Sequence, residues 1–394
     1  MGTDAYTATF RFTASLAGAP LTVVSKPGLE QAERVPDAAV LAAELIWPAP
    51  DERVLLLGCG HGALGVALAR QLPHGRLTLS DPSLIALRMA ALTLAANGVT
   101  QAQVSEQVSQ LPAAAAAYDR VVLMVPQSRA LGRRWLVEAH ALLRPGGVLN
   151  VAGANVLGVQ PLIGDAAQLF GAAHTLGYGR GCRVAEACRV DPHGAAAPPW
   201  ASAPGIAPGS WHHVAADLPG GPLELLSLPG VFSYDRLDAG TAFLLQQLAL
   251  QPGLRVLDAG CGYGPIGVAA ARLGAAQVLM LDANLLAVAA ARANLARLGL
   301  QAATAAPSDA LEAAMGQRFD LVLSNPPFHS GKAVDTTVAD ACIAQARDLL
   351  VPEGRIVLVT SSFLPFERHM AVHFARVRIV AANRSFRVLE GRHL

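Results

Sequence analysis

Residues 256–267 read VLDAGCGYGPIG, an apolar run that passes through closely spaced glycines into a second apolar run. The first run is typical of a strand and the second of a helix. Glycines between them let the backbone turn tightly and approach a ligand, because no Cβ atom stands in the way. An acid, Asp282, ends the next predicted strand, about where a carboxylate accepts hydrogen bonds from ribose hydroxyls. This combination indicates a Rossmann-like α/β domain that binds a nucleoside-containing cofactor.

The same pattern occurs earlier in the chain, as VLLLGCGHGALG at residues 54–65. An offset of 202 positions relates the two stretches, and it also relates LAGAPLTVVSKPG from Leu16 to LPGGPLELLSLPG from Leu218. A chain of 394 residues is too long for one ordinary hydrophobic core. We therefore predict two copies of one module.

Composition places the boundary between the modules. Residues 191–209 are rich in Pro, Gly and Ala and have no helical or strand period, which predicts a linker between modules at 1–190 and 210–394. In each module, near-continuous apolar strands alternate with helices, so we expect a mostly parallel sheet covered on both faces. RVRIVAA (376–382) and FRVLE (386–390) are joined by a short Asn-containing turn and predict an antiparallel hairpin at the sheet edge.

Bulk composition excludes several classes of protein. Hydrophobic residues make up 53% of the chain, but no run approaches the roughly 18 apolar residues of a membrane span, and the N-terminus lacks a signal-peptide pattern. We therefore expect a cytoplasmic protein with no membrane partner. The five cysteines form no CxxC pair, which argues against a disulfide framework or a metal site. The net charge of +1 does not by itself indicate nucleic-acid binding.

The position of Asp258, two residues before Gly260, bears on the kind of cofactor. A dinucleotide site holds a pyrophosphate at the start of the helix, and an acid there would repel it. The same acid suits a cation or an ammonium group. A nicotinamide-dependent dehydrogenase is therefore the less favoured interpretation.

Residues 324–331, SNPPFHSG, follow the predicted strand FDLVL, at the edge where such sheets bind ligands. An exocyclic amine on a heteroaromatic ring is a poor nucleophile because its lone pair is delocalised into the ring. The Asn325 side-chain oxygen and the Pro326 carbonyl can accept both of its N–H bonds, Pro327 adds no competing N–H, and Phe328 can stack on the base. The alternative is a strand that simply ends at Pro-Pro with a buried Phe.

Taken together, GVFSYDRLDAGT (230–241), VLDAGCGYGPIG, SNPPFHSG and FRVLEG (386–391) resemble the ribosomal RNA small subunit methyltransferase C family and its large-subunit relatives. The resemblance implies two tandem Rossmann-like class I methyltransferase domains, each a mostly parallel seven-stranded sheet with an antiparallel edge hairpin. It implies S-adenosylmethionine as cofactor, the N2 amine of a guanine as methyl acceptor, and ribosomal RNA or the small ribosomal subunit as partner of a monomeric enzyme.

The resemblance also assigns roles to residues. The glycine loop takes the methionine portion of the cofactor, Asp282 the ribose and Asp309 the adenine, although Asp309 could equally cap a helix. The expected cofactor-binding residues are Asp258, Gly260, Gly262, Gly264, Asp282, Asp309, Phe232, Asp238 and Thr241. The expected catalytic residues are Asn325, Pro326, Pro327 and Phe328, and the candidates for RNA contact are His329, Lys332, Arg384 and Arg387, with Arg368, Arg376 and Arg378 near the same sheet edge.

The first module departs from this pattern at the decisive positions. It keeps its glycines and Asp81, but Leu56 replaces Asp258 and Val125 replaces Asn325. Without an acceptor for an amine, we predict that it is non-catalytic. Glu30, Pro36 and Gln127 replace Phe232, Asp238 and Pro327, and Arg129, Arg133 and Arg134 are either RNA-docking residues or a solvated helix face.

Two other functions stay open from the sequence. Asn-Pro-Pro-aromatic also suits enzymes that methylate another planar nitrogen: a guanine N2 of large-subunit RNA, adenine N6, cytosine N4 or a protein glutamine. A non-catalytic RNA-binding assembly factor is the alternative from a different class. Intact Asp258, Asp282 and Asn325 argue against it.

Overall fold

The computed structural model describes residues 6–107, 109, 116–190, 197–326, 329–330, 333–334 and 336–393. It divides into two compact units. Thr9–Trp211 form the N-terminal unit, which includes the predicted linker. His212–Leu394, together with the start of the chain up to Ala8, form the C-terminal unit.

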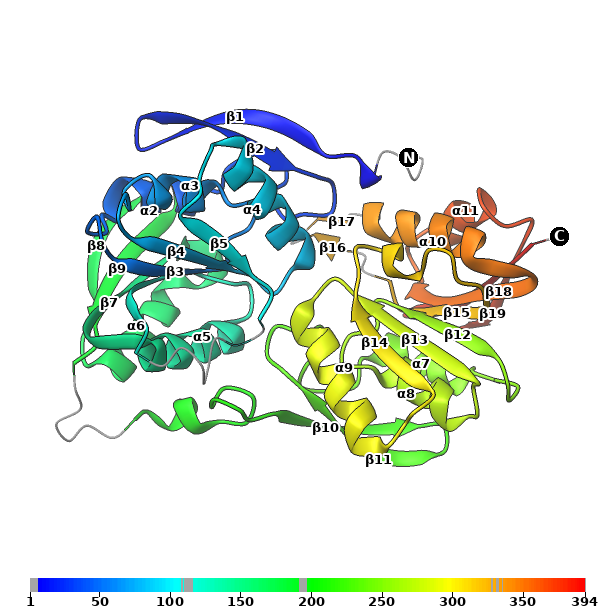
Figure 1. Ribbon diagram of the computed structural model, residues 1–394. Coiled ribbons are helices and arrows are strands. Elements are labelled where there is room, and N and C mark those ends of the chain that lie inside the picture. Colours follow the sequence, from blue (N-terminus) through cyan, green and yellow to red (C-terminus); the bar gives the residue numbers. More distant parts are fainter. Residues whose placement is uncertain are drawn as a thin grey trace. The chain divides into compact units, whose positions relative to one another are not determined.

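The C-terminal unit is built on a seven-stranded sheet of order β14-β13-β12-β15-β18-β20-β19 (Figure 1). All neighbours are parallel except β20, which pairs antiparallel with both β18 and β19. The strands are β12 (Arg255–Ala259), β13 (Gln277–Asp282), β14 (Ala303–Pro307), β15 (Phe319–Ser324), β18 (Leu350–Ser361), β19 (Arg376–Ala382) and β20 (Phe386–Arg392). The predicted edge hairpin is therefore confirmed.

Helices cover this sheet because its central strands are apolar on both sides. The helices are α7 (Ala239–Gln246), α8 (Pro265–Arg272), α9 (Leu285–Leu298), α10 (Thr337–Leu349) and α11 (Phe366–Ala371). Helix α8 packs on β12 and β13, whereas α10 packs on β18. Leu257, Val322 and Ile356 of the strands share one buried cluster with Ile343 of α10 and Phe366 of α11. The unit also contains the hairpin β10 (His212–Leu218) and β11 (Gly221–Ser227) and the short pair β16 (His329–Ser330) and β17 (Ala333–Val334).

The N-terminal unit repeats this topology, with the strand order β5-β4-β3-β6-β7-β9-β8. Its strands are β1 (Phe10–Leu16), β2 (Ala19–Ser25), β3 (Arg53–Leu57), β4 (Arg76–Ser80), β5 (Ala102–Ser105), β6 (Tyr118–Met124), β7 (Leu143–Ala154), β8 (His174–Gly179) and β9 (Cys182–Cys188). Its helices are α2 (Asp37–Leu45), α3 (Ala63–Ala69), α4 (Leu84–Ala96), α5 (Arg129–Leu142) and α6 (Val159–Phe170). The predicted fold class, two tandem Rossmann-like domains, is confirmed. None of the helices described is long and apolar enough to cross a membrane.

Packing explains why the last glycines of each loop are needed. Gly264 has φ 97, and a Cβ atom added there would lie 2.4 Å from the Met280 side chain. A Cβ atom at Gly267 would lie 2.5 Å from the same side chain. In the N-terminal unit, Gly62 and Gly65 would clash in the same way with α4 and β4. These glycines let a helix approach the sheet closely whether or not a ligand binds.

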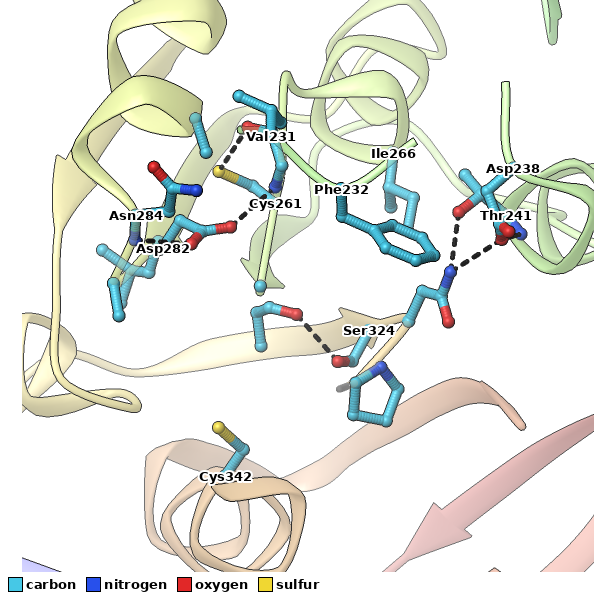
Figure 2. Close-up of a pocket in the computed structure, with 18 of the residues that line it drawn as sticks. Val231, Phe232, Asp238, Thr241, Cys261, Ile266, Asp282, Asn284, Ser324 and Cys342 are labelled. Carbon is cyan, nitrogen blue, oxygen red and sulfur yellow. Dashed lines mark hydrogen bonds between the residues drawn. The ribbon is translucent and has the colours of Figure 1, made fainter. Parts of the chain in front are cut away.

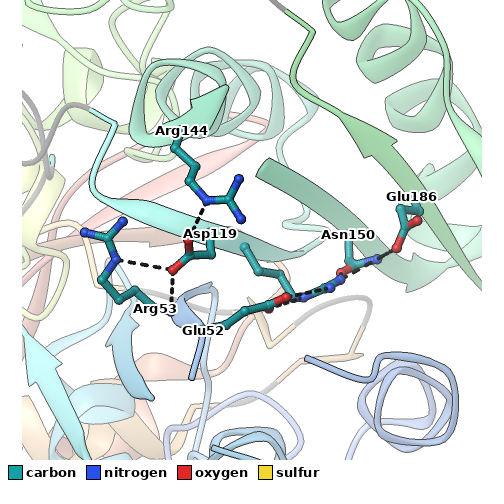
Figure 3. Close-up of polar contacts among 7 residues, drawn as sticks. Glu52, Arg53, Asp119, Arg144, Asn150 and Glu186 are labelled. Atoms are coloured by element: carbon teal, nitrogen blue, oxygen red, sulfur yellow. Dashed lines mark hydrogen bonds and ion pairs between the residues drawn. The ribbon is translucent and has the colours of Figure 1, made fainter. Parts of the chain in front are cut away.

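Polar contacts tie the strands of the N-terminal unit together (Figure 3). Asp119 of β6 accepts hydrogen bonds from Arg53 of β3, at 3.2 Å, and from Arg144 of β7, at 2.6 Å. Burial raises the pKa of Asp119, but the bonds from Arg144 and Arg53 outweigh it, so the pKa is lowered. The C-terminal unit repeats the first contact between Arg255 and Asp320, at 3.0 Å. The two units therefore share this hydrogen bond at equivalent positions.

The arginines of α5 that were candidates for RNA docking are used inside the unit. Arg129 and Arg133 both donate bidentate hydrogen bonds to the carboxylate of Asp165 on α6, at 2.8–3.0 Å. Arg134 is buried and donates to the carbonyl of Gly205. A buried carboxylate such as Asp165 needs this pairing, so the structure gives these arginines a structural role.

A cluster around Glu390 of β20 stabilises the C-terminal sheet. Its carboxylate accepts hydrogen bonds from Arg355, Arg378 and Arg392, each at 2.9 Å. Burial raises the pKa of Glu390, but the three guanidinium groups together lower it to about 2. This pKa is below the ordinary value of 4.5. The stabilisation is therefore complete above about pH 4.5 and is lost as the pH falls through 2.

We expect Glu390→Gln to lower the free energy of unfolding by ~1–3 kcal/mol at pH 7, because the charge-assisted hydrogen bonds are weakened. Between pH 4.5 and pH 2 the variant should lose less stability than the wild type. Urea unfolding followed by circular dichroism measures both effects. Glu353→Gln, at an exposed position of β18, is the control, and equal losses in the two variants would contradict the assignment.

Candidate active site

A cavity of about 450 Å³ opens in the C-terminal unit at the carboxyl ends of β12, β13 and β15 (Figure 2). This is the edge at which open α/β sheets bind ligands. Segments from the whole unit line it: Val231–Ser233, Asp238, Thr241, Ala259–Tyr263, Pro265, Ile266, Leu281–Asn284, Ala287, Ser308, Ala310, Ser324–Pro326, Val338, Cys342, Ser361 and Phe386.

Asp282 holds the glycine loop at one end of the cavity. Its carboxylate accepts hydrogen bonds from the Gly262 amide at 2.9 Å and from the Asn284 amide at 2.8 Å. Burial raises the pKa of Asp282, although these backbone amides oppose the rise. The Asn284 side chain in turn donates to the carbonyl of Gly230. Asp282 therefore positions the loop and also faces the cavity, as its assignment to a ribose requires.

Open space lies over the glycine loop. A Cβ atom added at Gly262 would meet nothing within 4 Å, and one at Gly260 would meet only the carbonyl oxygen of Asn325, 4.0 Å away. The loop and the Asn325 segment, 65 residues apart in the sequence, are thus brought together at one site. A ligand that lies over Gly260 reaches Asn325.

Asp258 lies behind the loop and does not line the cavity. It is fully buried, and one carboxylate oxygen accepts a hydrogen bond from the Gly267 amide at 2.8 Å. The other oxygen, Oδ1, is buried and has no hydrogen-bond partner among the residues described. Burial raises the pKa of Asp258 to about 7. The nearby charge of Asp282 also raises this pKa, whereas the hydrogen bond from the Gly267 amide lowers it. The position of Asp258 anchors α8 and places potential negative charge under the loop.

The orientation of the Asn325 side chain is determined by two acceptors. Its amide nitrogen donates to the Asp238 carboxylate and to the Thr241 hydroxyl, both at 2.9 Å (Figure 2). Asp238 also accepts from the Thr241 amide at 2.8 Å and so caps α7. A carboxylate cannot donate, so the nitrogen must face Asp238. The Asn325 oxygen is therefore the end of the amide that is left for a ligand.

The rest of the predicted site is placed as follows. Pro326 lines the cavity beside Asn325, and Phe232, 70% exposed, lies at its rim near Ile266 (Figure 2). Gly264 starts α8 and does not line the cavity. Pro327, Phe328 and Lys332 fall outside the residues that the structure describes, and His329 lies in β16.

The aspartate predicted to meet an adenine is placed differently from the expectation. Asp309 is absent from the cavity lining, and its carboxylate accepts a hydrogen bond from the Tyr6 hydroxyl at 2.5 Å. Its neighbours Ser308 and Ala310 line the cavity instead. Sequence reasoning could not find this contact, because Tyr6 carries no motif and lies 303 positions away.

The candidate RNA-binding arginines fall into two groups. Arg387 is paired with Glu367 at 2.6 Å, and Arg378 with Glu390. Arg384 is exposed and forms no ion pair with the part of the chain described; only its carbonyl is engaged, by Ser362. Of these three, Arg384 is the one whose guanidinium is most accessible to a phosphate.

The sequence missed part of the cavity lining. Ser361 and Phe386 face each other in the β18–β20 register and both line the cavity. Phe386 opens the FRVLEG stretch, so its aromatic side chain at a strand start was a signal that could have been used. Cys342 lines the cavity from α10, and burial raises its pKa to about 12, with a further rise from Asp309 and Asp282. No group of three potential metal ligands occurs among the residues described.

The N-terminal unit keeps the glycine loop and its acid but lacks the side-chain acceptor that Asn325 provides. Asp81 accepts hydrogen bonds from the Gly60 and Ser83 amides at 3.0 and 2.9 Å, as Asp282 does. At the position of Asn325 stands Val125, which has no polar side-chain atom. Gln127 instead donates to Glu30 at 3.0 Å.

Asp258 gives a testable pH dependence. Its folded pKa of about 7 lies above the ordinary 3.8, so its contribution to stability decreases as the pH rises from 3.8 through 7. In Asp258→Asn this decrease is absent. We expect the variant to gain roughly 2–3 kcal/mol relative to the wild type between pH 5 and pH 8, measured by urea unfolding. Asp217→Asn, at an exposed position, is the control, and parallel pH curves for Asp258→Asn and the wild type would refute the assignment.

Comparison with known proteins gives the same result for both units. A family model described as "Methyltransferase small domain" matches residues 20–186 and 222–390. Among solved structures, a T. thermophilus 16S rRNA N2 methyltransferase in complex with AdoMet and guanosine has a TM-score of 0.80 and 28% identity, and the match covers 100% of both chains.

Curated relatives are more similar in sequence. Ribosomal RNA small subunit methyltransferase C of Pseudomonas entomophila (strain L48) is 36% identical over 275 residues, 69% of this chain and 78% of the relative. The enzyme of the same name from Stutzerimonas stutzeri (strain A1501) is 34% identical, and the match covers 69% of this chain and 78% of the relative. Ribosomal RNA large subunit methyltransferase G of Pseudomonas paraeruginosa (strain DSM 24068 / PA7) is 32% identical, and the match covers 86% of this chain and 87% of the relative. Since the small-subunit enzymes are the more similar in sequence and one of that kind matches the whole fold, this chain belongs to the ribosomal RNA small subunit methyltransferase C family.

Proposed function

We propose that this protein transfers a methyl group from S-adenosylmethionine to the exocyclic N2 amine of a guanine in small-subunit ribosomal RNA. The observation that carries the proposal is the orientation of Asn325, whose amide oxygen is left for a ligand by its hydrogen bonds to Asp238 and Thr241. The relatives' names and the guanosine in the related structure support guanine as the acceptor base.

The residues of the cavity fit the cofactor. S-adenosylmethionine supplies a methyl group on a positively charged sulfonium, together with an ammonium and a ribose. The open space over Gly260 and Gly262 suits its methionine portion, and Asp282 its ribose hydroxyls. The Asp258 carboxyl behind the loop has a pKa of about 7, and a cation bound at the loop would favour its ionised form.

The acceptor amine is held by groups that only accept hydrogen bonds. The Asn325 side-chain oxygen and the Pro326 carbonyl take its two N–H bonds and keep the nitrogen closer to tetrahedral geometry. Its lone pair is then directed out of the ring plane instead of into it. Positioning of this kind lowers a barrier without covalent chemistry. A general base is unnecessary, because the ammonium product is acidic and loses its proton readily.

The substrate base must be unpaired or turned out of a helix, since a paired guanine does not expose N2 to a cavity of this depth. Phe232 at the rim and Phe386 in the wall offer rings for stacking. Arg384 is our candidate for a phosphate contact. Ribosomal RNA is the partner, and the assembled small subunit, a monomeric enzyme and a cytoplasmic site of action remain predictions.

The N-terminal unit is proposed to be non-catalytic. Val125 supplies no side-chain acceptor for an amine, and Leu56 replaces the acid that lies behind the loop in the C-terminal unit. The hydrogen bond between Glu30 and Gln127 uses the two positions that correspond to Phe232 and Pro327. Pro126 remains at the position of Pro326, but the side-chain acceptor that Asn325 provides is absent.

Asn325→Ala tests the proposal directly. We expect kcat to fall about 10²–10³-fold, because a positioned acceptor is lost, while the Kd for S-adenosylmethionine is unchanged. Transfer of labelled methyl groups to small subunits and to free 16S RNA measures the effect. Val125→Ala, at the equivalent position of the N-terminal unit, is the matched control and should be fully active. Preferred transfer to DNA, to large subunits or to a protein glutamine would reject guanine N2 of small-subunit RNA as the acceptor.

Asp238→Ser tests whether the amide orientation matters. Serine still caps α7 but is too short to hold the Asn325 nitrogen. We expect kcat to fall roughly 10- to 100-fold with little change in stability. Asp235→Ser in the same loop, where Asp235 is exposed and forms an ion pair with its neighbour Arg236, should retain activity. Normal turnover by Asp238→Ser would show that Asn325 is oriented by other means.

A further inference from the structure

We propose that Tyr6, at the start of the chain, is a positioning residue of the cofactor cavity, which acts by holding Asp309 and with it the loop after β14. The inference rests on the proposed function, since it assumes that the cavity holds S-adenosylmethionine. It gives a role in cofactor binding to a segment that carries no motif.

Tyr6 is built into the C-terminal unit as a core residue would be. Only 2% of its surface is exposed, and its hydroxyl donates to the Asp309 carboxylate at 2.5 Å. A short O–H···O⁻ bond of this kind is among the stronger hydrogen bonds in proteins. The chain up to Ala8 groups with the C-terminal unit, whereas Thr9 already belongs to the N-terminal unit.

The loop that Asp309 occupies forms part of the cavity wall. Ser308 and Ala310, the residues on either side of Asp309, both line the cavity. Ala310 has φ 47, a left-handed conformation that is unfavourable for an alanine. Such a conformation persists only where surrounding contacts impose it.

Three hydrogen bonds from different elements impose this conformation. The Ser308 amide donates to the carbonyl of Asp282 at 2.9 Å. The Leu311 amide donates to the buried side chain of Gln345 on α10, at 2.8 Å. Between these two anchors, the Asp309 side chain is held by Tyr6. The Tyr6 bond is the one that comes from outside residues 212–394.

This arrangement changes the role expected for Asp309. Its carboxylate holds Tyr6 instead of facing the cavity, so a cofactor at this wall meets Ser308 and Ala310. Loss of the Tyr6 hydroxyl removes one of the contacts that hold Asp309 and the left-handed Ala310 in place. The wall then loses its preformed shape, and binding must restore it. The methyl-acceptor end, at Asn325, is untouched by this change.

The test uses the full-length chain with Tyr6→Phe, which removes a single oxygen atom. We expect the Kd for S-adenosylmethionine, measured by calorimetry, to rise about 5- to 30-fold, the equivalent of one strong hydrogen bond. The kcat at saturating cofactor should stay within about twofold of the wild-type value. Tyr178→Phe, at a tyrosine that is 78% exposed in the N-terminal unit, is the control and should leave Kd unchanged.

A double-mutant cycle distinguishes positioning from a general effect on folding. In an Asp309→Ala background, Tyr6→Phe should cause no further loss of affinity, because its partner is already absent. An unchanged Kd in Tyr6→Phe, even with lowered stability to urea, would overturn the inference. So would equal and additive losses in the two backgrounds. Failure of methyl transfer to RNA with intact cofactor binding would instead count against the proposed function alone.

Discussion

The two hydrogen bonds to the amide nitrogen of Asn325 decide what the cavity can do. The nitrogen donates both, and the acceptors are Asp238 and Thr241, on a different segment from the strand that precedes Asn325. An asparagine whose amide was free to rotate would present a donor as often as an acceptor to an incoming amine. With the nitrogen engaged, the oxygen and the neighbouring Pro326 carbonyl form an acceptor-only edge beside a loop that suits a cationic donor. We propose that the choice of an amine as methyl acceptor follows from that edge.

The duplication separates the requirements of the fold from those of the chemistry. Both units keep glycines that allow a helix to approach the sheet, and both keep an acid that accepts two loop amides. These features persist in the N-terminal unit because they stabilise the loop without a ligand. The N-terminal unit does not keep Asp258 or Asn325. At these positions it has the apolar residues Leu56 and Val125 instead. A glycine-rich loop with its acid is therefore a weak indicator of activity, and the amine acceptor is a strong one.

The arginines show how far composition misleads about binding. Arg129, Arg133 and Arg134 serve buried acids and carbonyls of the N-terminal unit, and Arg355, Arg378 and Arg392 surround Glu390. The pairings with Asp165 and Glu390 let these buried carboxylates stay charged. The number of arginines in the sequence therefore does not by itself indicate an RNA-binding surface.

Local periodicity and motifs of adjacent residues were enough to predict the duplicated α/β fold, the edge hairpin and the pairing of a glycine loop with Asp282 and Asn325. Three other features became visible only in the folded chain: Asp258 lies behind the loop, Asp238 and Thr241 orient Asn325, and Asp309 is held by Tyr6. Those contacts join segments up to 303 residues apart. Hydrogen bonds between such distant segments produce no periodic pattern in the sequence, so they could not be predicted from it. A motif can show which groups are present, but the side on which each group presents its donor or acceptor depends on neighbours that the motif does not contain.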